Sequence, residues 1–166
     1  MSRALVDDIQ AQSGRLTLNL RIALETCDLS AELFGVPLWK HLYHTMHSLD
    51  QWFINPARYE EPPFHVHGLN SLDERSPVAL DKRQLSDYLL QIDHKITAYL
   101  QGLTDEQLVI RPHGCEHTRL ALILGQTRHC MCHIGIINGA TIAATGKWPR
   151  VVGMAHSDPE HDGYFE

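Results

Sequence analysis

The chain has 166 residues, enough for a single core, and we expect residues 1–166 to form one domain. The formal net charge of −6 argues against a broad nucleic-acid-binding surface, because such surfaces need a basic patch. Hydrophobic content of 43% is typical of a soluble globular protein, whereas 12 histidines are an unusual number for a chain of this length. Histidine is the commonest metal ligand and the usual acid–base group near neutral pH, so the composition points toward site chemistry.

The N-terminal third predicts two helices. The first extends from about residue 3 to residue 32, with apolar side chains at helical spacing and a weak interruption at Ser13-Gly14. The second begins near Val36-Pro37, because proline suits the first turn of a helix, and it ends at Asn55-Pro56. One apolar stripe runs along this second helix: Leu38, Leu42, Met46, Leu49 and Phe53.

Residues 56–80 are rich in proline and predict a long connection with little regular structure. Such loops are uncommon, so this one is expected to cover a site or to cross between distant helix ends. Its two histidines, His65 and His67, are expected to lie in solvent, with a role as additional metal ligands as the alternative.

The C-terminal half predicts two more helices. Asp81 is a candidate N-cap, with Gln84 three residues later, and the helix that it starts runs to Gly102. A helical turn follows at residues 104–107, and a fourth helix runs from about residues 117–118 to Gly146. This fourth helix is apolar all round and is therefore expected to be buried. With almost no strand-like alternation, the chain is predicted to be an all-α four-helix bundle.

The strongest local motif is the histidine pair in the segment from His129 to His133. Four residues advance 400° around a helix, so the two rings lie about 40° apart on one face and can reach one divalent cation. Hydrogen bonds between the rings, or to the backbone, are the alternative. The glutamate that follows the first histidine in zinc-protease helices is absent, because Cys130 stands there.

A third ligand is expected from another helix. The second helix carries His41, His44 and His47 at intervals of three residues, on one ridge. His44 lies roughly opposite the centre of the apolar stripe, which favours a solvated face unless the helix has neighbours on both sides. Candidates for a supporting hydrogen bond to the ligands are polar residues on the same two helices: Asp50, Gln126 and Asn138. The alternative for each is a position on the surface or a hydrogen bond between helices.

The segments from His44 to Trp52 and from His129 to Gly135 resemble the two motifs of the DinB-like family of metal-binding helical bundles. That resemblance implies an up-down-down-up four-helix bundle with a crossover between the second and third helices. It also implies a site made by His44, His129 and His133, with His47 as the alternative to His44. Many members of the family continue the last histidine with Arg-Gly-Gln, where this chain has Ile134-Gly135-Ile136.

The same resemblance implies a divalent metal, nickel or zinc, with water completing the coordination, and a homodimer. Relatives include enzymes that use the metal to activate a small-molecule thiol. The expected function is therefore a metal-dependent hydrolase or a thiol-dependent transferase. The alternative is a non-catalytic module that binds metal or mediates dimeric interactions.

The location of the protein is expected to be cytoplasmic, without a membrane or nucleic-acid partner. The N-terminal residues do not read as a secretory signal, and no apolar run approaches the roughly 18 uninterrupted residues of a membrane span. The cysteines are expected to be reduced: Cys27, Cys115, Cys130 and Cys132.

Overall fold

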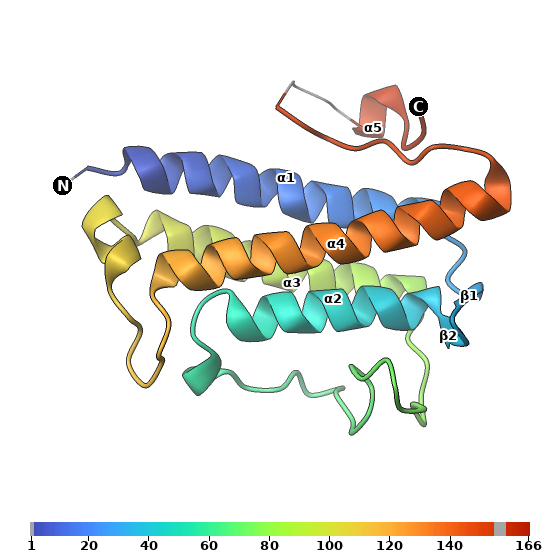
Figure 1. The fold of residues 1–166 in the computed structure, drawn as a ribbon, viewed down its shortest axis with the longest axis horizontal. Coiled ribbons are helices and arrows are strands. Elements are labelled where there is room, and N and C mark those ends of the chain that lie inside the picture. Colours follow the sequence, from blue (N-terminus) through green and yellow to red (C-terminus); the bar gives the residue numbers. More distant parts are fainter. Residues whose placement is uncertain (1, 155–158) are drawn as a thin grey trace.

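The computed structural model describes residues 2–154 and 159–166, where four long α-helices lie side by side (Figure 1). These are α1 (Ala4–Thr26), α2 (Leu38–Trp52), α3 (Lys82–Gln101) and α4 (Arg119–Thr145). The shorter elements are β1 (Glu32–Leu33), β2 (Val36–Pro37), the 3₁₀ turns η1 (Pro56–Arg58) and η2 (Asp105–Val109), and α5 (Pro159–Asp162). The predicted all-α class is confirmed, since the only sheet within the described ranges is the two-stranded β1–β2 pair.

The caps of α3 and α4 lie where the sequence predicts them. The Asp81 carboxylate accepts a hydrogen bond from the Gln84 backbone N–H (2.8 Å), and the Gln84 side chain accepts one from the Asp81 N–H (3.0 Å). Thr118 caps α4 through a bond from the Ala121 N–H (3.2 Å). Gly146 ends α4 with a φ of +69°, a left-handed conformation that favours glycine.

The first helix ends at Thr26, six residues before its expected end at residue 32. Residues 27–31 turn the chain, and the Asp28 side chain accepts a bond from the Ser30 N–H (2.9 Å). The β1–β2 hairpin follows, with Phe34 and Gly35 both at positive φ in its two-residue turn. Short strands of this kind carry no periodic signal, so the apolar pattern alone predicted a longer helix.

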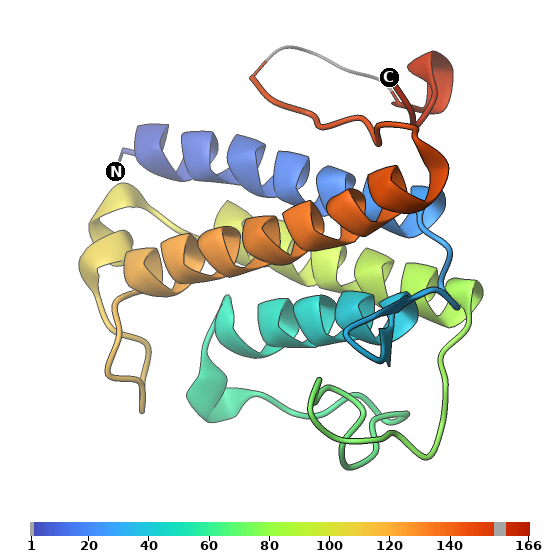
Figure 2. The same ribbon diagram turned by 45° about the vertical axis from the view of Figure 1, so that its right-hand side comes forward.

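Helix α2 has neighbours on several sides, because it packs against both α3 and α4. The connection of residues 56–80 lies along α2 on the side away from α1 (Figures 1 and 2). As a result, the ridge of histidines is not solvated: His41 and His47 are buried, and His44 is half-buried. The helical wheel identified the apolar stripe correctly but could not reveal the second set of neighbours.

Helix α4 is less buried than its composition predicted. Its contacts with α1 and α2 bury residues such as Ile123, Cys130 and Ile137, while Leu124 (57% exposed) and Ile136 (38%) remain open to solvent. By length and composition alone α4 could cross a membrane, a property that it shares with core helices of soluble proteins.

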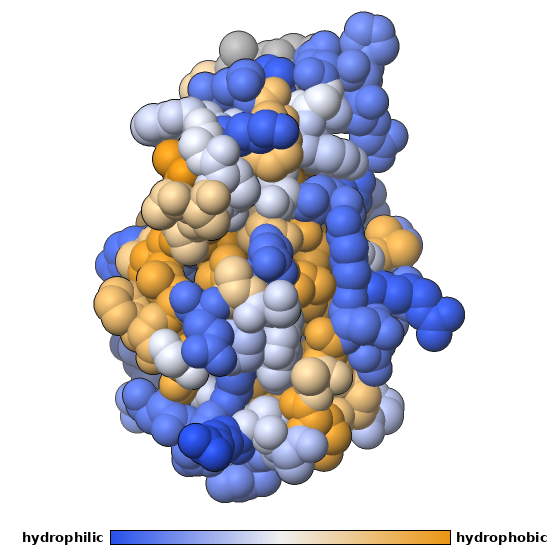
Figure 3. Space-filling model, turned by 90° about the vertical axis from the view of Figure 1, so that its right-hand side faces the viewer, coloured by the Kyte–Doolittle hydropathy of each residue, from blue (hydrophilic) through white to orange (hydrophobic). Residues whose placement is uncertain are grey.

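The segment after α4 turns back over α1 (Figure 1). The buried Asn19 side chain holds it there, since it donates to the Val152 carbonyl (2.9 Å) and accepts from the Val152 N–H (2.7 Å). Apolar and polar patches are mixed on the surface at the end of the molecule that carries the hairpin (Figure 3).

Candidate metal centre

His44, His129 and His133 come together between α2 and α4. One ring nitrogen from each lies within 4.8 Å of the others. The ring centroids are 4.5 Å apart for His129 and His133, 4.8 Å for His44 and His133, and 5.4 Å for His44 and His129. The structure therefore places His44, the ligand implied by the family resemblance, beside the pair on α4.

The alignment of α2 with α4 sets this arrangement. Cys130, adjacent to His129, is fully buried and its thiol lies 4.0 Å from the backbone carbonyl oxygen of Thr45, adjacent to His44. The four-residue spacing then puts His129 and His133 on one face of α4, one turn apart. Two helices in direct contact thus present three imidazoles to one small volume.

The rings differ in their hydrogen bonds. His44 Nδ1 lies 2.8 Å from the Asn70 carbonyl oxygen, so this nitrogen donates and Nε2 keeps its lone pair. The Nδ1 atoms of His129 and His133 are buried with no hydrogen-bond partner among the described residues. A buried polar atom left unpaired costs about 1–3 kcal/mol, so these rings are suited to an additional ligand. The three side chains therefore fit a divalent cation.

The surroundings keep the imidazoles on α4 neutral. Burial lowers the pKa of His129, and the positive charge that His44 can carry lowers it further. Burial, together with the neighbouring histidines, lowers the pKa of His133 from 6.5 to about 4. Neutral imidazole is the form that binds a metal, so near pH 7 no proton has to leave these two rings first.

A second group of possible ligands contains His47, Glu61 and His65, whose ligand atoms also lie within 4.8 Å of one another. His47 Nε2 lies 2.7 Å from the Glu61 carboxylate, and His65 Nδ1 lies 2.8 Å from the Tyr43 hydroxyl. The expectation that His65 is solvated is wrong, because the connection folds it against α2. His67 does remain exposed, as expected.

Hydrogen bonding distinguishes the two groups. In the second group, both nitrogens of His47 have partners, Glu61 on one side and the Asn70 amide (3.3 Å) on the other. That network satisfies its polar atoms without a cation. The first group leaves two buried nitrogens unpaired. His47 thus belongs to a different cluster from His129 and His133.

The residues that we expected to support the metal ligands make hydrogen bonds to other groups instead, or none. Asp50 accepts from Lys95 (2.8 Å) and Tyr88 (3.0 Å), and Gln126 accepts from Ser48 (3.2 Å). The oxygen of the Asn138 side chain is buried and has no partner among the described residues. The group that holds a candidate ligand is a backbone carbonyl in the loop, which side-chain spacing does not reveal.

Comparisons of the chain with models of protein families, with curated proteins and with solved structures found no match.

Proposed function

We propose that this protein binds one divalent metal ion through His44, His129 and His133. The observation that carries the proposal is the pair of buried, unpaired nitrogens of His129 and His133, which face no hydrogen-bond partner in the described chain. The half-buried His44 completes the group, with one nitrogen already occupied by the Asn70 carbonyl. The lowered pKa of His133 supports it, because that ring is neutral at pH 7.

We also propose that the chain is related to the DinB-like family and shares its up-down-down-up four-helix bundle. In support, His44 lies on the second long helix, and His129 and His133 lie on the last one. Helices α1 and α4 run in one direction and α2 and α3 in the other, with residues 56–80 crossing between α2 and α3 (Figure 1).

Nickel and zinc are the proposed metals, because imidazole nitrogens suit both. A metal with three protein ligands and an open position acts as a Lewis acid that lowers the pKa of bound water or holds a thiolate. The protein's own contribution is to keep the rings neutral and to orient His44 through Asn70. Metal-dependent hydrolysis or thiol-dependent group transfer is the proposed activity, with non-catalytic metal binding as the alternative.

Metal binding is tested with protein purified without a histidine tag. Wild type should take up about one nickel or zinc ion per chain, release it to a chelator and melt at a higher temperature when loaded. His133→Ala should lose the ion, whereas His67→Ala, which changes an exposed loop histidine, should keep it. Wild-type protein that binds no ion and melts unchanged would exclude the proposal.

Activity is tested separately on the loaded protein. A panel of small-molecule thiols with electrophiles, and a panel of simple esters and amides, covers the two reaction classes. Turnover that disappears with chelator and in His133→Ala would assign an enzyme. Stoichiometric binding without turnover on either panel would favour the non-catalytic module.

We further propose that two copies associate through the outer face of α4. Exposed apolar side chains lie on both edges of that face, with Leu124 and Met131 on one edge and Ile136 on the other. A second copy packed across the face would bury apolar side chains on both edges. Light scattering should give twice the monomer mass, and Ile136→Glu should give a monomer. A wild-type monomer at high concentration would contradict the homodimer.

A further inference from the structure

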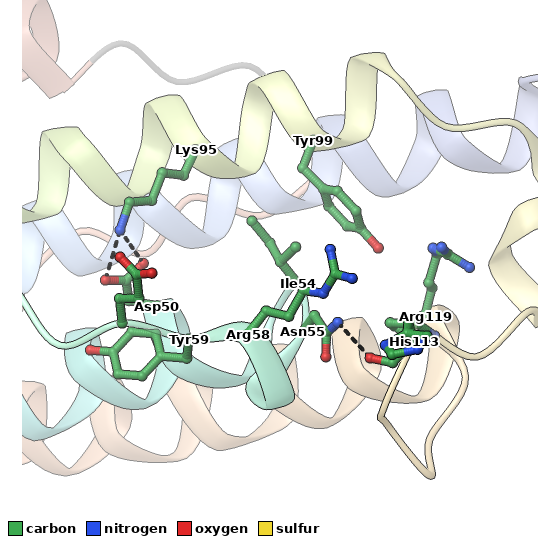
Figure 4. Close-up of a pocket in the computed structure, with 11 residues that line it drawn as sticks. Asp50, Ile54, Asn55, Arg58, Tyr59, Lys95, Tyr99, His113 and Arg119 are labelled. Carbon is green, nitrogen blue, oxygen red and sulfur yellow. Dashed lines mark hydrogen bonds and ion pairs between the residues drawn. The ribbon is translucent and has the colours of Figure 1, made fainter.

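A separate cleft lies at the C-terminal end of α2. It is bounded by η1, the second half of α3 and the segment that enters α4 (Figure 4). Its volume is about 550 Å³, within the range of small-molecule sites. None of the three histidines of the candidate metal centre lines it. Any ligand of this cleft would therefore be held by a different set of side chains.

The charges around the cleft favour an anion. Asp50 is buried and accepts hydrogen bonds from Lys95 (2.8 and 3.0 Å) and Tyr88 (3.0 Å), so its negative charge is compensated. Arg58 and Arg119 line the same cleft and have no carboxylate partner within the described residues. A second carboxylate, Glu60, also lines the cleft, so the two guanidinium groups outnumber it by one. This local positive charge occurs on a chain whose net charge is −6.

The position of the Arg119 guanidinium is fixed by the backbone. Its Nη1 donates to the carbonyl oxygens of Ile110 (3.0 Å) and Gln107 (3.4 Å). Its Nε is buried and has no hydrogen-bond partner in the part of the chain that the structure describes. A guanidinium held in this way can bind an oxyanion without losing further side-chain freedom.

Two more donors accompany Arg119. The Tyr99 hydroxyl is buried beside the Arg119 guanidinium and has no other hydrogen-bond partner within the described ranges. Burial raises the pKa of Tyr99 more than the nearby Arg119 lowers it, so the hydroxyl stays protonated and can donate at neutral pH. The Arg58 guanidinium extends into the cleft below Tyr99, on the side toward Arg119 (Figure 4).

We infer that this cleft binds a small organic anion whose carboxylate or phosphate group lies between Arg58 and Arg119. Guanidinium groups pair with both kinds of oxyanion through strong, charge-assisted hydrogen bonds. The Tyr99 hydroxyl supplies a third donor to the same group. The apolar part of the ligand packs on Ile54 and the ring of Tyr59, which also line the cleft. This inference does not depend on the metal centre.

Calorimetric titration of the metal-free 166-residue chain tests the inference, with phenyl phosphate, benzoate and inorganic phosphate as probes. At least one organic probe should bind saturably, more tightly than inorganic phosphate and more weakly as salt is added. The stronger of phenyl phosphate and benzoate identifies the preferred oxyanion. Arg58→Gln should weaken that binding by about tenfold or more, because a charge-assisted contact is lost.

The Arg58 side chain is exposed and makes no hydrogen bond in the described chain, so its replacement should leave the fold intact. Tyr99→Phe should weaken binding several-fold, and Arg128→Gln, which changes an exposed arginine of α4 outside the cleft, should not change it. The inference is overturned if no probe binds saturably, or if Arg58→Gln binds the organic probes as tightly as wild type does.

Discussion

His44 donates a hydrogen bond from Nδ1 to the backbone carbonyl oxygen of Asn70, at a distance of 2.8 Å. Asn70 belongs to the connection between α2 and α3, so this bond couples the loop to the candidate metal centre. It fixes the tautomer of His44 with an unprotonated Nε2, which is the atom that a metal requires. The loop therefore contributes to the site even though it supplies none of the three rings.

The first prediction separates His44 from His47. His44→Ala should lose the metal, because His44 lies beside His129 and His133 (ring centroids 5.4 and 4.8 Å). His47→Ala should keep it, since His47 is bonded to Glu61 and Asn70. Metal content per chain, measured by elemental analysis, decides between them. Loss of metal in His47→Ala alone would assign the site to the other group.

The second prediction is that the free energy of unfolding of the metal-free protein depends on pH through His133. Burial lowers the pKa of His133 in the folded state to about 4, against 6.5 for a free side chain. Between these two pKa values the unfolded chain binds a proton that the folded chain does not. The free energy of unfolding therefore has its full value above pH 6.5 and falls as the pH drops toward 4. Urea unfolding between pH 7 and pH 4 measures this loss.

The matched variants for this pH series are His133→Gln and His94→Gln, the second at an exposed position of α3. The slope of stability against pH should be shallower in His133→Gln than in wild type and unchanged in His94→Gln. Equal slopes in wild type and His133→Gln would show that His133 is not held neutral by the fold.

The third prediction concerns neighbouring cysteines. Cys130 is fully buried, and burial raises the pKa of its thiol to about 12, whereas Cys132 is exposed. Because the thiolate is the reactive form, Cys132 should react with a thiol reagent at pH 8 at least about a hundred times faster than Cys130. Mass spectrometry of timed labelling locates the modified residue. Labelling of both at one rate would contradict the packing of α4 on α2.

The fourth prediction is that relieving backbone strain at Phe34, in the turn of the β1–β2 hairpin, stabilises the protein. Phe34 has a φ of +55° and is 92% exposed, so it carries the strain of a left-handed residue without burying its ring. Asparagine tolerates this conformation better and is favoured in two-residue turns before glycine. Phe34→Asn should raise the free energy of unfolding by about 0.5–1 kcal/mol, measured by urea denaturation. A destabilised variant would mean that the Phe34 ring makes contacts that stabilise the fold.

Local signals predicted part of this structure well. The caps at Asp81, Thr118 and Gly146 depend on residues close in sequence, and the spacing of His129 and His133 depends on one helix. The end of α1 was misjudged because the apolar pattern of residues 27–32 does not distinguish a last helical turn from a turn followed by a short strand.

The features of the site that could not be predicted from the sequence are made by segments far apart along the chain. Helical spacing alone favoured a solvated face for His44 unless its helix had neighbours on both sides, because a helical wheel contains no information about α4 or the loop. The family resemblance, not the spacing, implied that His44 is a ligand. Glu61, His65 and Asn70 come from a proline-rich connection whose path depends on packing against α2. The hydrogen bond to Asn70 uses a backbone carbonyl, so its side-chain identity gives no signal at all.

The most direct test of the proposed metal centre is an anomalous difference map from crystals of the nickel- or zinc-loaded protein. We expect one peak per chain, about 2.0–2.1 Å from one nitrogen of each of His44, His129 and His133. A peak bounded instead by His47, Glu61 and His65, or no peak in protein soaked with excess metal, would contradict it.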